Sequence, residues 1–281
     1  MRIGRIAAMA AGWMAMALPA LAQDAPKAIT IATEGAYAPW NFTNADGKLD
    51  GLEVDLANDL CGRMKIQCTI VAQDWDGLIP SLTVGKFDVI MASMFITDKR
   101  LEVIDFTQPY AVDPSGFAVT KDSDLGKQAD SAQKIRLEDE AAADAAVEQL
   151  KPLLKGKIVG VQAATSNLEF LKKYFADTVE IREYKTTEQH DLDLSAGRID
   201  ALFAQQTALA ATLAKPEFAD FTLAGPGFVG GVFGLGTGAG LRKEDAKLKD
   251  MLNAAIEGAI ADGTIKRISE KWVKTDVTPV K

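Results

Sequence analysis

Short β-branched segments alternate with amphipathic helical segments along most of this chain, and this alternation restricts its fold more than any other feature. The predicted strands lie at residues 28–32, 66–72, 87–91, 158–161, 179–183 and 199–204. The predicted helices between and after them lie at residues 52–64, 75–84, 166–175, 188–195, 205–214, 243–260 and 264–273. A strand–helix–strand order favours parallel sheets with helices on both faces. We therefore predict an α/β protein with two lobes, which separate near residues 112–116.

Residues 124–155 have a different composition from the rest of the chain. This segment is rich in Ala, Asp and Glu and contains few large apolar residues. We predict a solvated helical excursion with a surface helix at residues 138–154.

The amino-terminal residues have the composition of a secretory signal peptide. Arg2 and Arg5 precede an apolar run, and Ala20–Ala22 forms a small-x-small cleavage site. We predict that residues 1–22 are removed by cleavage near Ala22. The alternative is a membrane anchor, but its uncharged stretch would have only 17 residues, which is at the short limit for a helix that crosses a membrane. Cleavage changes the net charge from -8 to -8 - 2 = -10. Such an acidic chain is a poor candidate for binding nucleic acid.

The two cysteines and the single histidine limit the chemistry that this chain can perform. They are too few for a Cys-rich or His-rich metal site, and no other ligand cluster indicates a metal. We predict that His190 lies on a solvated helix face, which argues against a Ser-His-Asp triad. The run from Gly234 to Ala239 formally fits a dinucleotide fingerprint, but it does not open the first helix of a βαβ unit.

Cys61 and Cys68 are predicted to form a structural disulfide. Cys61 falls late in a predicted helix and Cys68 at the start of the next strand, so a tight turn can bring them within bonding range. The alternative, a redox-active pair, would require the C-x-x-C spacing that is missing here.

Several polar and aromatic residues follow the predicted strands and suit a charged small molecule. Arg100 offers a planar fork for a carboxylate, and Ser93 can donate to the same oxygens. Trp75 and Tyr37 are suited to flank the ligand, and Glu34 to neutralise a cation. Because ligands of open α/β sheets bind beyond the carboxyl ends of strands, we predict a site between the lobes.

Seven segments spread over nearly all of the mature chain carry a family resemblance. They are Glu34–Phe42 (EGAYAPWNF), Gly51–Leu56 (GLEVDL), Trp75–Leu82 (WDGLIPSL), Phe87–Met91 (FDVIM), Ile96–Arg100 (ITDKR), Ser195–Asp200 (SAGRID) and Gly263–Lys266 (GTIK). With them, the chain resembles the periplasmic polar amino-acid-binding proteins of ABC transporters, solute-binding protein family 3. The cysteine pair is similar to that of the basic-amino-acid branch.

The resemblance implies a type II periplasmic binding protein, in which two α/β lobes are joined by two hinge strands near residues 112–116 and 225–232. Residues 23–113 and 229–281 would form the large lobe and residues 114–228 the small lobe. It further implies a monomeric, cofactor-free transport protein in the periplasm that is not an enzyme and delivers its ligand to a membrane permease.

The same resemblance assigns roles to individual residues. Arg100 would bind the ligand carboxylate, assisted by Ser93 and the backbone of Ala92 and Met94. Tyr37 and Trp75 would be the aromatic walls and Glu34 the acidic contact. In the small lobe, the implied contacts are Gln162, Ala164, Thr165, Ser166, Asn167 and Gln205.

Two departures from the family pattern bear on the ligand. Gln205 stands where the family usually has an Asp that pairs with the α-ammonium group, and Phe95 replaces a common hydroxyl residue. A neutral amide suits a ligand with a substituted nitrogen and a second carboxylate, which describes an opine, a conjugate of an amino acid and a keto acid. Ser166, Asn167 and Gln162 would receive the second carboxylate. Gln162 and the Glu188-x-His190 pattern also resemble the octopine- and nopaline-binding members.

Three other functions stay open. One is a binding protein for basic amino acids such as arginine, ornithine, lysine or histidine. Another is an enzyme similar to the periplasmic cyclohexadienyl dehydratases, for which Glu34 would be the general acid. The third is the ligand-sensing domain of a receptor, which would normally continue into a membrane helix.

Overall fold

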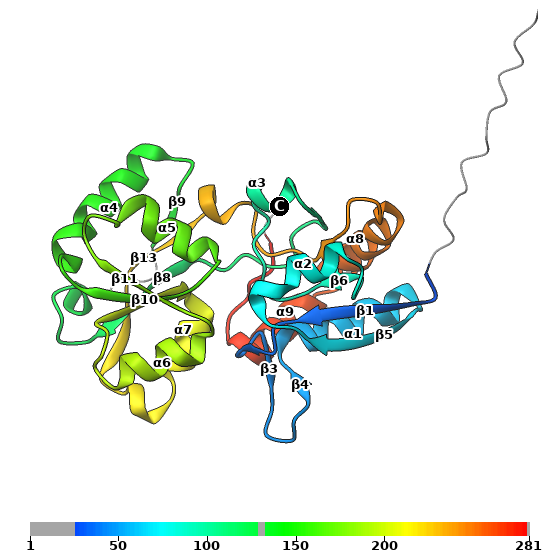
Figure 1. Ribbon diagram of the computed structural model, residues 1–281, viewed down its shortest axis with the longest axis horizontal. Coiled ribbons are helices and arrows are strands. Elements are labelled where there is room, and N and C mark those ends of the chain that lie inside the picture. Colours follow the sequence, from blue (N-terminus) through cyan, green and yellow to red (C-terminus); the bar gives the residue numbers. More distant parts are fainter. Residues whose placement is uncertain (1–25, 129–132, 280–281) are drawn as a thin grey trace, which may run out of the picture.

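The computed structural model describes residues 26–128 and 133–279, which form two lobes, each built around its own sheet (Figure 1). The predicted α/β class and two-lobe type II architecture are confirmed. The predicted signal peptide, residues 1–22, lies outside the described residues. In the described ranges, no helix has both the length and the apolar character needed to cross a membrane.

The first lobe contains both ends of the described chain. Its main sheet has the order β5-β1-β6-β14-β7, formed by Gln67–Ala72, Ala28–Thr33, Val89–Ile90, Gly240–Leu241 and Asp105–Phe106. Strands β5 and β6 pair in parallel with β1, whereas β14 is antiparallel to β6 and β7. The other elements of this lobe are α1 (Leu52–Met64), α2 (Leu78–Thr83), α3 (Asp98–Leu101), α8 (Ala246–Ala261), α9 (Thr264–Val273) and a small sheet of β2 (Ala36–Tyr37), β3 (Asn41–Thr43) and β4 (Leu49–Asp50).

The second lobe is built around a sheet with the order β11-β10-β12-β8-β13-β9. These strands are Glu180–Tyr184, Ile158–Gln162, Ala201–Gln205, Ser115–Thr120, Phe221–Val229 and Lys134–Arg136. Its helices are α4 (Glu140–Leu154), α5 (Ser166–Tyr174), α6 (Thr187–Ser195) and α7 (Gln206–Leu213). Phe170 and Phe203 stack in the core, with ring centroids 4.8 Å apart.

The prediction that residues 124–155 are a solvated excursion is wrong for the described part of this segment, although the helix predicted at residues 138–154 is present as α4. Strand β9 pairs in parallel with β13 at the edge of the second sheet. The buried face of α4 consists of Ala143, Val147, Leu150 and Leu154, which belong to the core of this lobe. Their spacing places a few apolar residues on one helix face, which is enough to bury a helix of low overall hydrophobicity.

The prediction of a solvated His190 is also wrong. This residue is only 1% exposed, because it lies on the inward face of α6. The ring of Tyr184 packs against it edge-on, and Asp191 lies 3.0 Å from its Nδ1. The polar residues around His190 in the sequence conceal this burial.

The chain passes between the lobes twice, from β7 to β8 and from β13 to β14. In the second passage, Thr237 forms isolated bridges with Phe95 and Ala111. Gly234 has a φ of 60°, and a Cβ atom there would lie 1.7 Å from the carbonyl oxygen of Ile96. Gly234 therefore lets its backbone lie close to that of Ile96. This packing role accounts for part of the glycine pattern at residues 234–239 without a bound nucleotide. The lobe boundaries at 113/114 and 228/229 remain our proposal.

The predicted disulfide between Cys61 and Cys68 is confirmed. Lys65, with a φ of 57°, ends α1 in the left-handed conformation and turns the chain into β5. This turn brings the two Cα atoms to 6.2 Å, within the range of ordinary disulfides.

Removing the disulfide should destabilise the protein. The double substitution Cys61→Ser and Cys68→Ser should lower the free energy of unfolding by about 2 kcal/mol, since the short loop no longer restricts the unfolded chain. Urea denaturation followed by circular dichroism measures the change. Reduced wild-type protein is the control and should show a similar loss; an unchanged midpoint in both would contradict the prediction.

Candidate functional site

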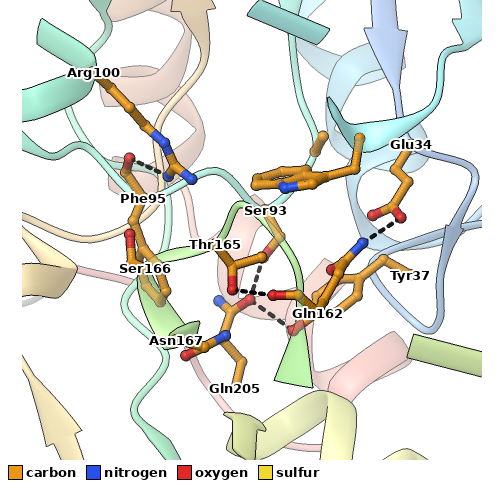
Figure 2. Close-up of a pocket in the computed structure, with 12 residues that line it drawn as sticks. Glu34, Tyr37, Ser93, Phe95, Arg100, Gln162, Thr165, Ser166, Asn167 and Gln205 are labelled. Atoms are coloured by element: carbon orange, nitrogen blue, oxygen red, sulfur yellow. Dashed lines mark hydrogen bonds between the residues drawn. The ribbon is translucent and has the colours of Figure 1, made fainter. Parts of the chain in front are cut away.

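A cavity of about 20 Å³ lies between the two lobes and is lined by residues from both (Figure 2). This space is little more than one water molecule fills, so a small-molecule ligand requires the lobes to move apart. The lining residues are Glu34, Tyr37, Trp75, Ala92, Ser93, Phe95, Arg100, Gln162, Thr165, Ser166, Asn167 and Gln205. Many of them lie at or just beyond the carboxyl ends of β1, β5, β6, β10 and β12, where α/β sheets place their ligands.

The structure brings together all but two of the predicted site residues. The side chain of Met94 packs in the core of the first lobe and is 1% exposed. Ala164 is not part of the cavity wall, but its carbonyl oxygen accepts a hydrogen bond from Trp75 Nε1 at 3.2 Å. Phe95 lines the cavity and was missing from the predicted set, because the sequence indicated it only as the loss of a hydroxyl group.

Three direct side-chain hydrogen bonds connect the lobes inside the cavity (Figure 2). Gln162 Nε2 donates to Glu34 Oε1 at 2.7 Å. The hydroxyl groups of Tyr37 and Ser93 donate to Gln205 Oε1 at 2.9 and 3.0 Å. These bonds place the polar groups of both lobes around one small volume.

Arg100 presents a cation that lacks an ionic partner in the described ranges. Thr97 caps α3, and the Arg100 Nη1 group donates to the carbonyl oxygen of Phe95 at 2.9 Å. The guanidinium carbon lies 5.3 Å from the ring centroid of Trp75. Loss of hydration lowers the pKa of Arg100 to about 10, so it stays charged at neutral pH. A fixed, desolvated guanidinium is suited to a carboxylate ligand.

Glu34 is the acidic group of the cavity. It is 7% exposed, and burial raises its pKa to about 7, although the hydrogen bond from Gln162 opposes this shift. A carboxyl group with this pKa changes charge near neutral pH. A cation placed beside it would favour its ionised form.

Among the second-lobe residues that line the cavity, one buried donor and one buried acceptor lack hydrogen-bond partners within the described residues. The donor is Gln205 Nε2 and the acceptor is Asn167 Oδ1. Since two hydroxyl groups already donate to Gln205 Oε1, its amide group leaves N–H bonds for a ligand acceptor. The first turn of α5, at Ser166 and Asn167, adds backbone N–H groups to this wall.

A buried network beside Gln205 fixes the start of α7. Trp40 Nε1 donates to Thr207 Oγ1 at 2.9 Å, and the Thr207 hydroxyl donates to Asp113 Oδ2 at 2.5 Å. Burial raises the pKa of Asp113 to about 7. The sequence pattern did not indicate this network, because its residues come from three distant segments.

Residues 29–275 match the family model of bacterial extracellular solute-binding proteins, family 3, and the chain belongs to this family. The octopine-binding periplasmic protein of Rhizobium meliloti is 47% identical over 96% of this chain and 98% of that protein. The histidine-binding periplasmic protein of Salmonella typhimurium is 38% identical over 90% of each chain. A solved periplasmic His/Glu/Gln/Arg/opine family-binding protein from Silicibacter pomeroyi, in complex with lysine, has a TM-score of 0.71 at 31% identity and covers 90% of this chain and 100% of its own.

Proposed function

We propose that this protein is the periplasmic component of an ABC importer and binds an opine of the octopine type between its lobes. The observation that carries the proposal is Gln205, whose neutral amide lines the cavity where the family usually has an Asp and whose Nε2 has no hydrogen-bond partner among the described residues. The 47% identity with an octopine-binding protein supports the same ligand class.

The cavity offers a partner for both carboxylates and for the guanidinium group of such a ligand. Octopine joins arginine to a propionate group through a secondary amine, so at neutral pH it carries two carboxylates, a guanidinium group and a protonated amine. Arg100 would bind one carboxylate. Gln205 Nε2 and the first turn of α5 would receive the other, and Glu34 would pair with the guanidinium group.

A simple basic amino acid fits this arrangement less well. Its primary ammonium group would find an amide in place of a carboxylate and lose a charge-assisted hydrogen bond, which contributes about 1.5–3 kcal/mol. Basic amino acids are the second candidate ligand class, because a histidine-binding and an arginine-binding relative are 38% and 34% identical to this chain.

Calorimetry with octopine, nopaline, arginine, ornithine, histidine and glutamine tests the proposed ligand class. We expect octopine to bind at least about 10-fold more tightly than arginine, since each 1.4 kcal/mol changes affinity tenfold. Tight binding of arginine without any octopine signal would contradict the proposal.

The affinity for a ligand with a guanidinium group should depend on pH. Because the pKa of Glu34 is raised to about 7, this carboxyl group is mostly protonated below pH 7 and must release a proton to pair with a cation. Octopine affinity should rise by up to about tenfold per pH unit below pH 7 and level off above it. Titrations at several pH values measure this profile.

The control for the pH profile is Glu34→Gln, which keeps the shape of the side chain but cannot ionise. Its affinity should be weak and nearly independent of pH. A wild-type profile that stays flat, or a slope that persists in Glu34→Gln, would rule out Glu34 as the cation partner.

The proposal also covers the processing of the chain, its oligomeric state and the delivery of the ligand. Residues 1–22 are a signal peptide cleaved near Ala22. The protein acts as a monomer, and its lobes close on the ligand by a hinge motion. The closed form delivers the ligand to a membrane permease.

A further inference from the structure

Glu53 is a buried carboxylate that lies behind the cavity and does not line it. It belongs to the first turn of α1 and is 1% exposed. Its oxygens accept hydrogen bonds from the Ser93 backbone N–H, the Asn41 amide and the Tyr110 hydroxyl. Burial raises the pKa of Glu53, and these three hydrogen bonds oppose that rise.

The first of these bonds fixes Ser93, a residue of the cavity wall. Ser93 N donates to Glu53 Oε1 at 2.6 Å, and Ser93 has a φ of 50°. This left-handed conformation is unfavourable for a residue with a Cβ atom and persists only where its surroundings impose it. In this conformation, the Ser93 hydroxyl donates to Gln205 in the other lobe.

The second bond reaches the turn that contains Glu34. Asn41 Nδ2 donates to Glu53 Oε2 at 2.6 Å, while Asn41 Oδ1 accepts from Gly35 N at 2.8 Å. Gly35 directly follows Glu34 in the chain. Tyr37 is the register partner of Asn41 in the β2–β3 pair. One amide side chain therefore connects Glu53 to the acidic and aromatic parts of the cavity wall.

We propose that Glu53 is a positioning residue for ligand binding: it holds Ser93 and the Glu34–Gly35 turn in their binding geometry while contacting no ligand. Two strands, β1 and β6, lead into these segments, and α1 supplies the one carboxylate that joins them. The affinity test below rests on the proposed function, because its probe is octopine.

The substitution Glu53→Gln tests this role with little change in side-chain shape. Its amide group would direct N–H bonds toward Ser93 N or Asn41 Nδ2, which are themselves donors, so one of the present hydrogen bonds would be lost. We expect octopine affinity to fall by at least about 10-fold, because loose positioning weakens several contacts together. Calorimetry measures this loss, and thermal denaturation measures the change in Tm.

Leu252→Ala is the matched control in the same lobe. Leu252 is fully buried in the core packed around α1 and α8, and it is absent from the cavity wall. The substitution should lower Tm through a cavity in the core but leave octopine affinity within about twofold. If Glu53→Gln kept wild-type affinity, or if both variants lost affinity in proportion to Tm, the positioning role would be overturned.

Hydrogen exchange of the wild-type protein gives a test that needs no ligand and does not depend on whether a variant folds. The backbone amides of Ser93 and Gly35 should exchange only through large-scale unfolding, because Glu53 and Asn41 hold them. Rapid local exchange at both amides would overturn the proposal. If the wild-type protein bound neither octopine nor arginine, the proposed function would fail, while slow exchange at these amides would still support the positioning role.

Discussion

Replacing Arg100 with alanine should lower octopine affinity by about 100-fold or more, because removing one partner of a desolvated ion pair costs about 2–5 kcal/mol. The guanidinium group already donates to the Phe95 carbonyl and lies against Trp75, so little ordering is left for the ligand to impose. Calorimetry at neutral pH measures the loss.

The stability of the ligand-free Arg100→Ala protein separates binding from folding. Arg100 has no ion-pair partner in the described part of the chain and is desolvated, so its removal should leave Tm unchanged or raise it. Arg182→Ala, at an arginine on β11 outside the cavity wall, is the control and should keep wild-type affinity. Affinity within about threefold of wild type in Arg100→Ala would refute the carboxylate site.

Replacing Gln205 with aspartate should reverse the ligand preference. The new carboxylate would repel the second carboxylate of octopine and would attract the primary ammonium group of arginine. The shorter side chain draws its oxygens away from the Tyr37 and Ser93 hydroxyl groups, which now donate to Gln205 Oε1, so a control for side-chain length is needed. A charge-assisted hydrogen bond contributes about 1.5–3 kcal/mol, so the ratio of octopine to arginine affinity should shift by about 100-fold.

Gln205→Asn is the matched variant, since it has the length of aspartate without the charge. It should weaken octopine binding but leave arginine binding low. Equal ligand ratios in Gln205→Asp and Gln205→Asn would show that side-chain length, and not charge, sets the preference.

The fold and much of the cavity wall could be predicted because their signals are local in the sequence. Short β-branched runs and helical spacing place the sheets, and residues such as Trp75, Ser93 and Arg100 follow strand ends. Their convergence in one cavity follows from parallel strands that end at the same edge of a sheet.

The missed features depend on contacts between distant segments. Glu53 and His190 look like surface residues in a polar helical pattern, yet each is 1% exposed. Nothing near Asp113 in the sequence indicates its bond to Thr207, 94 residues away. Buried polar groups are stable only when tertiary contacts satisfy or enclose them, so a sequence pattern alone does not reveal them.

The sequence reveals that Gln205 stands at this position, but it does not reveal which hydrogen bonds its amide group makes. The sequence shows an amide where the family usually has an acid, but an amide offers both a donor and an acceptor. Tyr37 and Ser93 occupy the acceptor, and this leaves the donor for the ligand.

A crystal structure of the octopine complex is the most direct measurement of the central claim, because it shows which ligand group faces each side chain. We predict one carboxylate against Arg100 and the second within hydrogen-bond distance of the Gln205 amide, with the guanidinium group beside Glu34. An amine group facing Gln205, with neither carboxylate near it, would contradict the account.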